Sequence, residues 1–232
     1  MGNRERSTRY DLLFYSARQD VCFRMSTSDQ AVVFIVDDDD RVRAALQLLL
    51  KTVGLHSEAF ATPQGFLQHN LPDVASCLVL DVRLPGMSGL EVQHKLNEVG
   101  AQIPIIFITS HGDIPMSVAA MKSGAIEFLT KPFRDQDLLD AIQKALERAE
   151  NARQQSREVR TLKQRYESLT ARERQVMGLL VSGLLTKQIA TKLGTSEVTA
   201  QLHRGQVMHK MGVNSPIELG RVAEKLNLPI II

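Results

Sequence analysis

The chain has 232 residues, of which 44% are hydrophobic and 23% are charged, and its formal net charge is +2. These values are typical of globular proteins and the length suffices for two domains, which excludes fibrous and wholly disordered proteins. No apolar run approaches the roughly 18 residues of a membrane-spanning helix, and 2 cysteines are too few for a disulfide framework. We therefore expect a cytoplasmic protein that makes no membrane contact.

Charge is distributed unevenly along the chain. Residues 31–150 contain 16 acidic and 10 basic residues, whereas residues 151–232 contain 6 acidic and 13 basic residues. An acidic half joined to a basic half indicates two domains with different partners, and the basic half is the candidate for binding a polyanion. A basic surface that is simply solvated is the alternative, and charge alone does not separate the two.

The first 30 residues show no hydrophobic periodicity. We interpret residues 1–30 as a disordered N-terminal extension or as a misplaced start, because Met25 would also serve as an initiator. From residue 31 to residue 150, short apolar runs alternate with helical patterns, which predicts five β/α units. Such units form an open, doubly wound parallel sheet with helices on both faces. The predicted strands cover residues 31–36, 55–59, 77–80, 103–108 and 125–129.

Beyond residue 150 the pattern is helical only. Residues 145–169 contain no glycine or proline, which predicts that the last helix of the first domain continues as a helical linker over residues 151–168. A flexible charged tether is the alternative. Capping boxes at Thr170 and Ser215 then predict four short helices, packed as a bundle, within residues 169–232.

Polar residues follow the predicted strands of the first domain. Asp37 and Asp38 follow the first strand, Asp81 the third, Thr109 the fourth and Lys131 the fifth. These strand ends meet at one edge of a parallel sheet. Clustered carboxylates need a lysine or a hard cation, and Mg²⁺ leaves coordination positions open for phosphate oxygens. The set suits transfer of a phosphoryl group to an aspartate, although a lone aspartate after a strand more often caps the next helix.

The motifs at these strand ends carry a family resemblance. They are Val36-Asp37-Asp38, Leu80-Asp81-Val82-Arg83-Leu84-Pro85-Gly86-Met87-Ser88-Gly89, Ile108-Thr109-Ser110-His111-Gly112 and Lys131-Pro132-Phe133. Together they resemble the receiver domain of two-component response regulators over residues 31–150. The resemblance implies a CheY-like (flavodoxin-like) fold and a sensor histidine kinase as phosphate donor.

The resemblance also implies roles for single residues. Asp81 is the expected phospho-acceptor, and Mg²⁺ is expected on the carboxylates of Asp37, Asp38 and Asp81 and on the backbone carbonyl of Arg83. Thr109 and Lys131 are expected to bind phosphate oxygens, with a cis bond before Pro132. Phe128 is expected to be an aromatic switch that turns inward with Thr109, and core packing is the alternative for this side chain.

An enzyme is one rival reading of the first domain. A phosphatase that forms an aspartyl phosphate also needs aspartate, Mg²⁺ and lysine, but it usually carries a second acid two residues after the nucleophile. Arg83 stands at that position. We therefore expect a protein that accepts phosphate and loses it slowly, and not a dedicated enzyme.

The second domain resembles another family. Residues 169–177, 187–190 and 196–211 are similar to the four-helix domain of FixJ/NarL regulators, also called the LuxR type. The resemblance implies a helix-turn-helix formed by residues 186–193, a turn at Gly194 and the next helix, which runs to about Lys210. Helical spacing places Ala200, His203, Val207 and Met211 on the inward face of that last helix.

Another face of the same helix is expected to enter the major groove of double-stranded DNA. Gln201 is suited to adenine and Arg204 to guanine or phosphate. For Gly205, close approach to DNA and tolerated drift are equally good explanations. Many family members carry a charged residue at the position of Gln201, so the target sequence stays open. The full set of expected DNA contacts is Lys187, Lys192, Gln201, Arg204, Gly205, Met208 and Lys210.

The two resemblances together predict a transcriptional regulator whose DNA binding depends on phosphorylation of Asp81. The expected partners are a sensor histidine kinase, double-stranded DNA, RNA polymerase and a second copy of the chain in a phosphorylated homodimer. Release of an inhibitory contact between the domains is an equally physical route to activation. The alternative function is a phosphorylation-regulated adaptor that binds other proteins without sequence-specific DNA binding.

Overall fold

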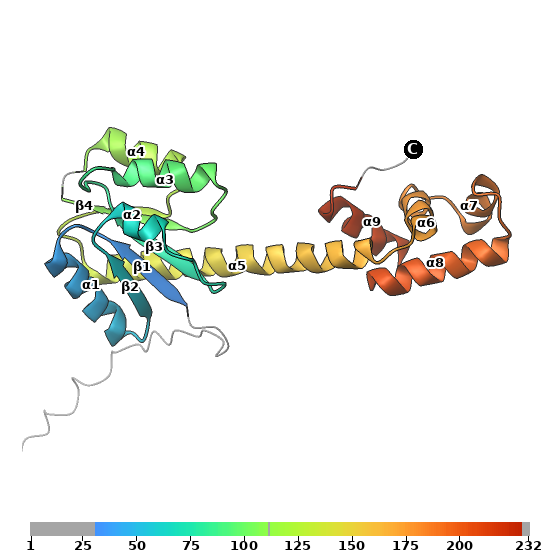
Figure 1. The fold of residues 1–232 in the computed structure, drawn as a ribbon, viewed down its shortest axis with the longest axis horizontal. Helices are drawn as coiled ribbons and strands as arrows, with labels where there is room; N and C mark the ends of the chain where they lie inside the picture. The colour runs from blue at the N-terminus through green and yellow to red at the C-terminus, as the bar shows by residue number, and fades with distance from the viewer. Residues whose placement is uncertain (1–30, 111, 229–232) are drawn as a thin grey trace, which may run out of the picture.

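The computed structural model describes residues 31–110 and 112–228. The interpretation of residues 1–30 as a disordered extension lies outside this described part. Figure 1 shows an α/β domain and a helical domain joined by one long helix. Within the described residues no helix combines the length and apolar character needed to cross a membrane. The predicted fold class, a doubly wound parallel sheet plus a helical domain, is confirmed.

Five parallel strands form the sheet of the first domain, in the order β2-β1-β3-β4-β5. The central strands are nearly continuous buried apolar runs because helices cover both of their faces. The strands are β1 (Val32–Val36), β2 (His56–Phe60), β3 (Ser76–Asp81), β4 (Ile105–Thr109) and β5 (Glu127–Thr130).

Helices pack on both faces of this sheet (Figure 1). One face is covered by α1 and α5, which bury Leu50 and Ile142. The other is covered by α2, α3 and α4, which bury Phe66, Val92 and Ala120. The helices are α1 (Asp40–Thr52), α2 (Pro63–Leu67), α3 (Gly89–Glu98), α4 (Ile114–Lys122) and α5 (Asp135–Glu167).

Helix α5 runs without interruption from the sheet into the second domain (Figure 1). Its first half is buried against the sheet at Leu138 and Ala149. Its last turn places Tyr166 against the core of the helical domain. The structure therefore shows the linker as helix and not as a flexible tether, so the ends of α5 belong to different domains.

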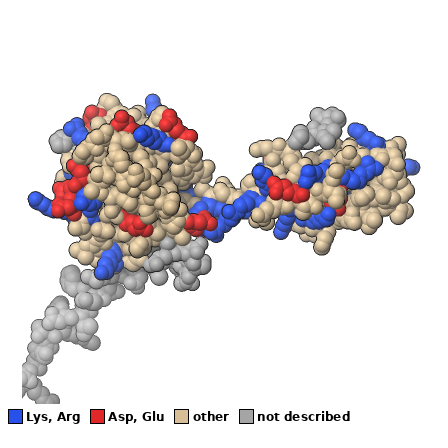
Figure 2. Space-filling model, in the orientation of Figure 1, with Lys and Arg blue, Asp and Glu red and all other residues tan. Residues whose placement is uncertain are grey.

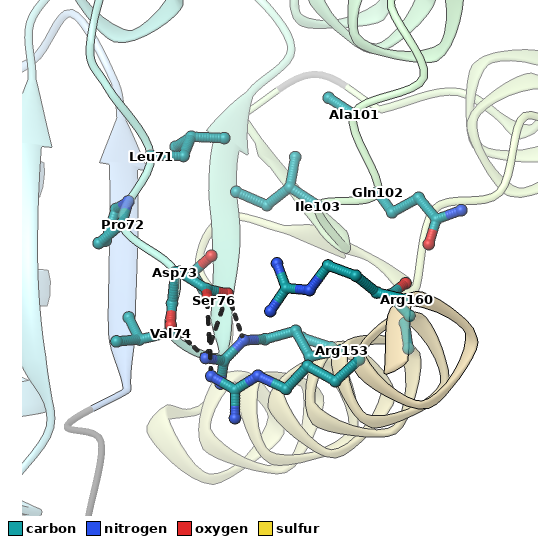
Figure 3. Close-up of a pocket in the computed structure, with 14 residues that line it drawn as sticks. Leu71, Pro72, Asp73, Val74, Ser76, Ala101, Gln102, Ile103, Arg153 and Arg160 are labelled. Carbon is teal, nitrogen blue, oxygen red and sulfur yellow. Dashed lines mark hydrogen bonds and ion pairs between the residues drawn. The ribbon is translucent and has the colours of Figure 1, made fainter. Parts of the chain in front are cut away.

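A salt-bridge cluster holds the middle of α5 to the α/β domain (Figure 3). Arg153 donates from Nε to Oδ1 of Asp73 at 3.3 Å and from Nη2 to the backbone carbonyl of the same residue. Arg157 lies 3.6 Å from Oδ2 of Asp73. These groups line a cleft of about 340 Å³ between α5, the segment before β3 and residues 101–103. Asp73 thus fixes the helix where it leaves the sheet.

Four helices form the second domain: α6 (Ala171–Val181), α7 (Thr186–Lys192), α8 (Glu197–Met211) and α9 (Pro216–Lys225). The predicted capping box at Thr170 is present, with Glu173 as its reciprocal partner. At Ser215 only half of the predicted box forms, because the Glu218 carboxylate accepts from Asn214 N–H instead of Ser215 N–H. The core includes Val176, Leu180, Ile189, Val207, Met211 and Leu219.

The helical domain is fixed to the end of α5 by polar contacts. Arg165 donates to the backbone carbonyl of Met211 at 3.1 Å, and Lys225 lies 2.6 Å from the Glu158 carboxylate. Gly212 ends α8 with φ +67°, and a Cβ at this position would clash with the Arg165 guanidinium. The left-handed backbone conformation therefore requires glycine, whereas the Arg165 guanidinium is the end of a flexible side chain and can move away from an added Cβ.

Replacing Asp73 with alanine is expected to loosen the middle of α5. The side chain of Arg153 is only 15% exposed and also pairs with Glu150 at 2.9 Å, so loss of the Asp73 carboxylate should loosen its hold on the α/β domain without removing its other ion pair. Limited trypsin digestion followed by mass spectrometry should show faster cleavage after Arg153 and Arg157. Glu98→Ala, which removes an exposed acid paired with His94 on α3, is the control and should leave cleavage unchanged. Equal cleavage of Asp73→Ala and wild type would contradict the anchoring role.

Candidate functional site

The first candidate site lies at the carboxyl end of the sheet. Asp37 follows β1, Asp81 ends β3, and Lys131 follows β5. The ammonium of Lys131 lies 2.6 Å from Oδ2 of Asp37 and 3.2 Å from Oδ2 of Asp81. Asp38 is exposed, and ligand oxygens of Asp37, Asp38 and Asp81 lie within 4.8 Å of one another. The structure therefore gathers the predicted carboxylates and lysine in one place.

The loop that carries Asp37 and Asp38 is held by an arginine on α1. Arg43 Nη1 donates to the backbone carbonyls of Asp37 and Asp38, at 2.8 and 2.9 Å. Asp39 N–H donates to Oδ1 of Asp37 at 2.9 Å, while the Asp39 carboxylate caps α1. The sequence reasoning missed Arg43. Its only signal was a basic residue in the first turn of a helix that starts beside clustered acids.

Burial and charge oppose each other in this site. Burial raises the pKa of Asp37 above its ordinary value, against the hydrogen bonds from Lys131 and Asp39 that lower it. Burial lowers the pKa of Lys131, but its hydrogen bond to Asp37 and the charges of Asp37 and Asp81 outweigh this, so the pKa is raised. Lys131 therefore stays charged at neutral pH and compensates one of the two buried carboxylates.

The donor set fits a hard divalent cation. Three carboxylates face one ammonium, which leaves an excess of negative charge, and their oxygens are the ligands that Mg²⁺ prefers. Arg83 lies beside this cluster, because its backbone N–H donates to Oδ1 of Asp81 at 3.2 Å. The use of the Arg83 carbonyl as a ligand stays a prediction.

Two further predicted residues meet beneath the loop after β4. Thr109 ends β4 and is fully buried, whereas Phe128 on β5 is half-buried with its ring centroid 6.2 Å from that of Phe107. A Cβ on Gly112 would lie 2.8 Å from the Phe128 ring and 3.2 Å from the Thr109 methyl. Only glycine lets this loop approach so closely, a role that the sequence reasoning did not assign. The Lys131–Pro132 bond is cis, as predicted.

The second candidate site is the outer surface of α7 and α8. Ala200, Val207 and Met211 are buried as predicted, whereas His203 is only half-buried. Gln201 and Gly205 are exposed and Arg204 is half-buried. The space beside Gly205 is open, so nothing in the described protein requires glycine there. Both lysines of α7, Lys187 and Lys192, are exposed.

Two expected DNA contacts need correction. Met208 packs against the core of the helical domain instead of lying on the exposed face. Lys210 points inward, with its ammonium 2.7 Å from the Glu173 carboxylate and 3.5 Å from the Ser168 carbonyl. Glu173 is buried and its pKa is lowered, first by the hydrogen bond from Lys210 and then by that from Thr170 N–H. Lys210 therefore joins α8 to α6.

The sequence reasoning also missed two apolar residues on α8. Val198 is 81% exposed and Leu202 is 61% exposed, although both are large and apolar. Helical spacing of four residues places them on one side of the helix, next to Gln201. Exposed aliphatic groups on a groove-facing helix suit contact with the methyl group of thymine.

Known proteins share both halves of the chain. The response regulator receiver domain matches residues 33–143, and the luxR family of bacterial regulatory proteins matches residues 167–223. Nodulation protein W of Bradyrhizobium diazoefficiens is 51% identical over 201 residues, which are 87% of this chain and 88% of that protein. The chain belongs to the response-regulator family. The predicted family is confirmed.

Other response regulators align over similar lengths. Response regulator protein TodT of Pseudomonas putida is 49% identical over 200 residues, 86% of this chain and 88% of that protein. Transcriptional regulatory protein FixJ of Azorhizobium caulinodans is 44% identical over 192 residues, 82% of this chain and 90% of that protein. This response regulator thus combines a receiver domain with a LuxR-type DNA-binding domain, which implies a sensor kinase and DNA as partners.

Solved structures show the same two-domain organisation. The response regulator StyR is 49% identical with a TM-score of 0.77 and covers 84% of this chain and 99% of its own. Full-length FixJ from B. japonicum is 36% identical with a TM-score of 0.51 and covers 87% of this chain and 100% of its own.

Replacing Lys210 with methionine is expected to destabilise the helical domain without changing its DNA surface. Loss of the ammonium leaves the buried Glu173 carboxylate with the hydrogen bond from Thr170 N–H but without its cation, at a cost of about 1 kcal/mol. In a domain of this size, that lowers Tm by about 4–8 °C. Because the pKa of Glu173 is lower in the folded than in the unfolded protein, the difference from wild type should be full at neutral pH and be lost as the pH falls below the ordinary glutamate pKa and through the lowered pKa of Glu173.

Calorimetry and DNA titration at several salt concentrations check this prediction. Lys187→Met, which removes an exposed lysine of α7, is the matched control: it should keep Tm and lose DNA affinity. The opposite pattern, in which Lys210→Met keeps Tm and weakens DNA binding, would return Lys210 to the DNA interface.

Proposed function

We propose that Asp81 accepts a phosphoryl group from a sensor histidine kinase and that this controls sequence-specific DNA binding by α8. The observation that carries the proposal is the position of Asp81, nearly buried at the end of β3 with Lys131 3.2 Å away. Helix α5 supports the coupling, because it is continuous from the residues after Lys131 to the DNA-binding domain.

The chemistry uses groups that the sheet already holds in place. An oxygen of Asp81 attacks the phosphorus of a phosphohistidine, the phosphorus–nitrogen bond breaks, and the imidazole leaves. Mg²⁺, held by Asp37, Asp38, Asp81 and the Arg83 carbonyl, would neutralise the phosphoryl oxygens. The Lys131 ammonium pairs with one phosphoryl oxygen, and the Thr109 hydroxyl donates a hydrogen bond to another.

The response then spreads through the loop after β4. Phosphorylation converts the singly charged carboxylate of Asp81 into an acyl phosphate that carries nearly two negative charges, and its oxygens draw Thr109 and Lys131 toward Asp81. Displacement of Thr109 vacates space beside Gly112, and the half-buried Phe128 ring turns into it. The changed surface pairs two receivers, so two DNA-binding domains occupy an operator with two half-sites and present it to RNA polymerase.

In this proposal the protein accepts a phosphoryl group but is not a dedicated enzyme. Arg83 stands two residues after Asp81, where phosphatases that use an aspartyl phosphate place a second acid. The absence of that acid supports slow loss of phosphate, and the phosphorylated state lasts long enough to affect transcription. We place this activity in the cytoplasm, where the chromosome lies.

The residues of the second candidate site fall into two groups, those suited to contact bases and those suited to contact phosphates. Gln201 and Arg204 carry the donors and acceptors that read base edges, and Gly205 lets the helix approach the groove. Lys187 and Lys192 provide cations for the phosphate backbone, which position the domain without reading sequence.

Asp81→Asn is expected to abolish labelling by acetyl phosphate and Mg²⁺, because the amide oxygen is a poor nucleophile. The variant should bind promoter DNA only as tightly as unphosphorylated wild type, whereas phosphorylation of the wild type should tighten binding about tenfold or more. Phosphate-affinity electrophoresis and gel shifts on the same samples provide both readouts. Persistent labelling of Asp81→Asn would move the acceptor elsewhere, and phosphate-independent specific binding would remove the coupling.

Arg204→Ala is expected to weaken binding to the operator and to leave labelling of Asp81 intact. The lost contact should cost about 1–3 kcal/mol on the preferred sequence. Fluorescence anisotropy with operator and scrambled duplexes measures the effect, and Arg148→Ala on α5 is an arginine control outside the helical domain. Undiminished operator affinity would exclude Arg204 from the interface, and no binding by any phosphorylated form would favour the adaptor alternative.

A further inference from the structure

A threonine on α7 lies between the two residues proposed to read bases. Thr186 Oγ1 donates to Oε1 of Gln201 at 3.3 Å, and Nη1 of Arg204 donates to Thr186 Oγ1 at 3.1 Å. Thr186 is the first residue of α7, whereas Gln201 and Arg204 lie on α8. One hydroxyl therefore joins both side chains to the neighbouring helix.

The chemistry of the side chains determines which group donates in these two hydrogen bonds. A guanidinium can only donate, so the Thr186 oxygen must accept from Arg204. The single hydroxyl proton is then left for the oxygen of the Gln201 amide. With the amide reversed, the hydroxyl oxygen would accept from both side chains and its proton would have only water as an acceptor, so the observed orientation is the one that satisfies the hydroxyl within the protein. The network thus orients the Gln201 amide with its NH₂ group turned away from Thr186.

This arrangement bears on recognition because Gln and Arg are long side chains with many rotamers. An unrestrained side chain loses that freedom when it binds a base, and a restrained one has already lost it. Specific contacts also need both hydrogen bonds of a bidentate pair at the correct angle. A base pair that fits the held geometry is favoured over one that would require Gln201 or Arg204 to leave Thr186.

We infer that Thr186 is a positioning residue for sequence discrimination: its hydroxyl orders Gln201 and Arg204 for the base edges of double-stranded DNA. The inference rests on the proposed function, in which α8 enters the major groove. The hydroxyl itself needs no contact with DNA. It sets the relative affinity for right and wrong base pairs, while the exposed lysines of α7 set the affinity for any duplex.

The test compares Thr186→Val, which keeps the shape and removes the hydroxyl, with Thr186→Ser, which keeps the hydroxyl. Full-length protein phosphorylated with acetyl phosphate is first used to select an operator from a random duplex library. Kd is then measured by fluorescence anisotropy for that operator, for every single base-pair substitution in it and for a scrambled duplex. Gln201→Ala and Arg204→Ala are measured in parallel, and thermal unfolding of each variant is recorded.

Thr186→Val is expected to reduce discrimination by about tenfold at the base pairs where Gln201→Ala and Arg204→Ala also reduce it. Thr186→Ser should restore discrimination. Binding to scrambled DNA and its salt dependence should match wild type, because no charge is removed. If Thr186→Val unfolds early, Thr186→Ala is compared with Thr186→Ser in its place.

Three results would overturn the inference, and they differ in what else they affect. Unchanged discrimination by Thr186→Val, where Gln201→Ala and Arg204→Ala have lost it, would remove the role of Thr186 and leave the proposed function standing. Full discrimination in Gln201→Ala and Arg204→Ala would show that this face of α8 does not read bases, and both proposals would fail. Failure of Thr186→Ser to restore discrimination would assign the effect to shape and not to the hydroxyl.

Discussion

The ion pairs of Lys131 with Asp37 and Asp81 are the interaction on which the receiver depends. Parallel strands bring two carboxylates to one edge of the sheet, and burial makes their mutual repulsion severe. The Lys131 ammonium lies 2.6 Å from Asp37 and 3.2 Å from Asp81, and its positive charge offsets part of this repulsion. The balance leaves an excess of negative charge on the three carboxylates, so this edge of the sheet suits a divalent cation.

Helix α5 connects the edge of the sheet that carries these ion pairs to the DNA-binding domain. Lys131 lies three residues before Arg134, the N-cap of α5, so the acidic site and the start of that helix are adjacent along the chain. At about 1.5 Å per residue, the stretch from Ala149 to Leu162 spans roughly 20 Å. Ala149 packs against the core of the first domain at one end of this stretch, and Leu162 is buried at the other, while Asp73 and Lys225 contact adjacent residues of its middle, Arg157 and Glu158. A helix fixed at both ends transmits rotation or displacement as a rigid body, which a flexible tether would lose.

The sequence predicted the acidic site well because topology alone places it. Apolar runs mark the strands, parallel strands end at a common edge, and Asp37, Asp81 and Lys131 follow those runs directly. The face of a helix that a polar residue occupies is harder to predict. Lys210 has the spacing of a surface residue, and only the buried Glu173 beside it reveals the inward orientation. Thr186 is 15 residues from Gln201 along the chain, so no local pattern indicates their contact.

Many basic side chains in residues 151–232 have partners within the protein. The excess of basic residues in this half suggests a strongly charged DNA-binding surface, yet many of these side chains form hydrogen bonds or ion pairs with other groups of the protein. They hold carbonyls at helix ends or pair with acids, and they include Arg165, Arg172, Arg174, Lys210 and Lys225. Figure 2 shows other basic side chains along α5, where Asp73 engages two of them. Lys187 and Lys192 are exposed on α7, beside the base-reading face of α8. Net charge therefore does not by itself locate a DNA-binding surface in this domain, because phosphate contacts position a protein on the duplex and only contacts with base edges carry sequence specificity.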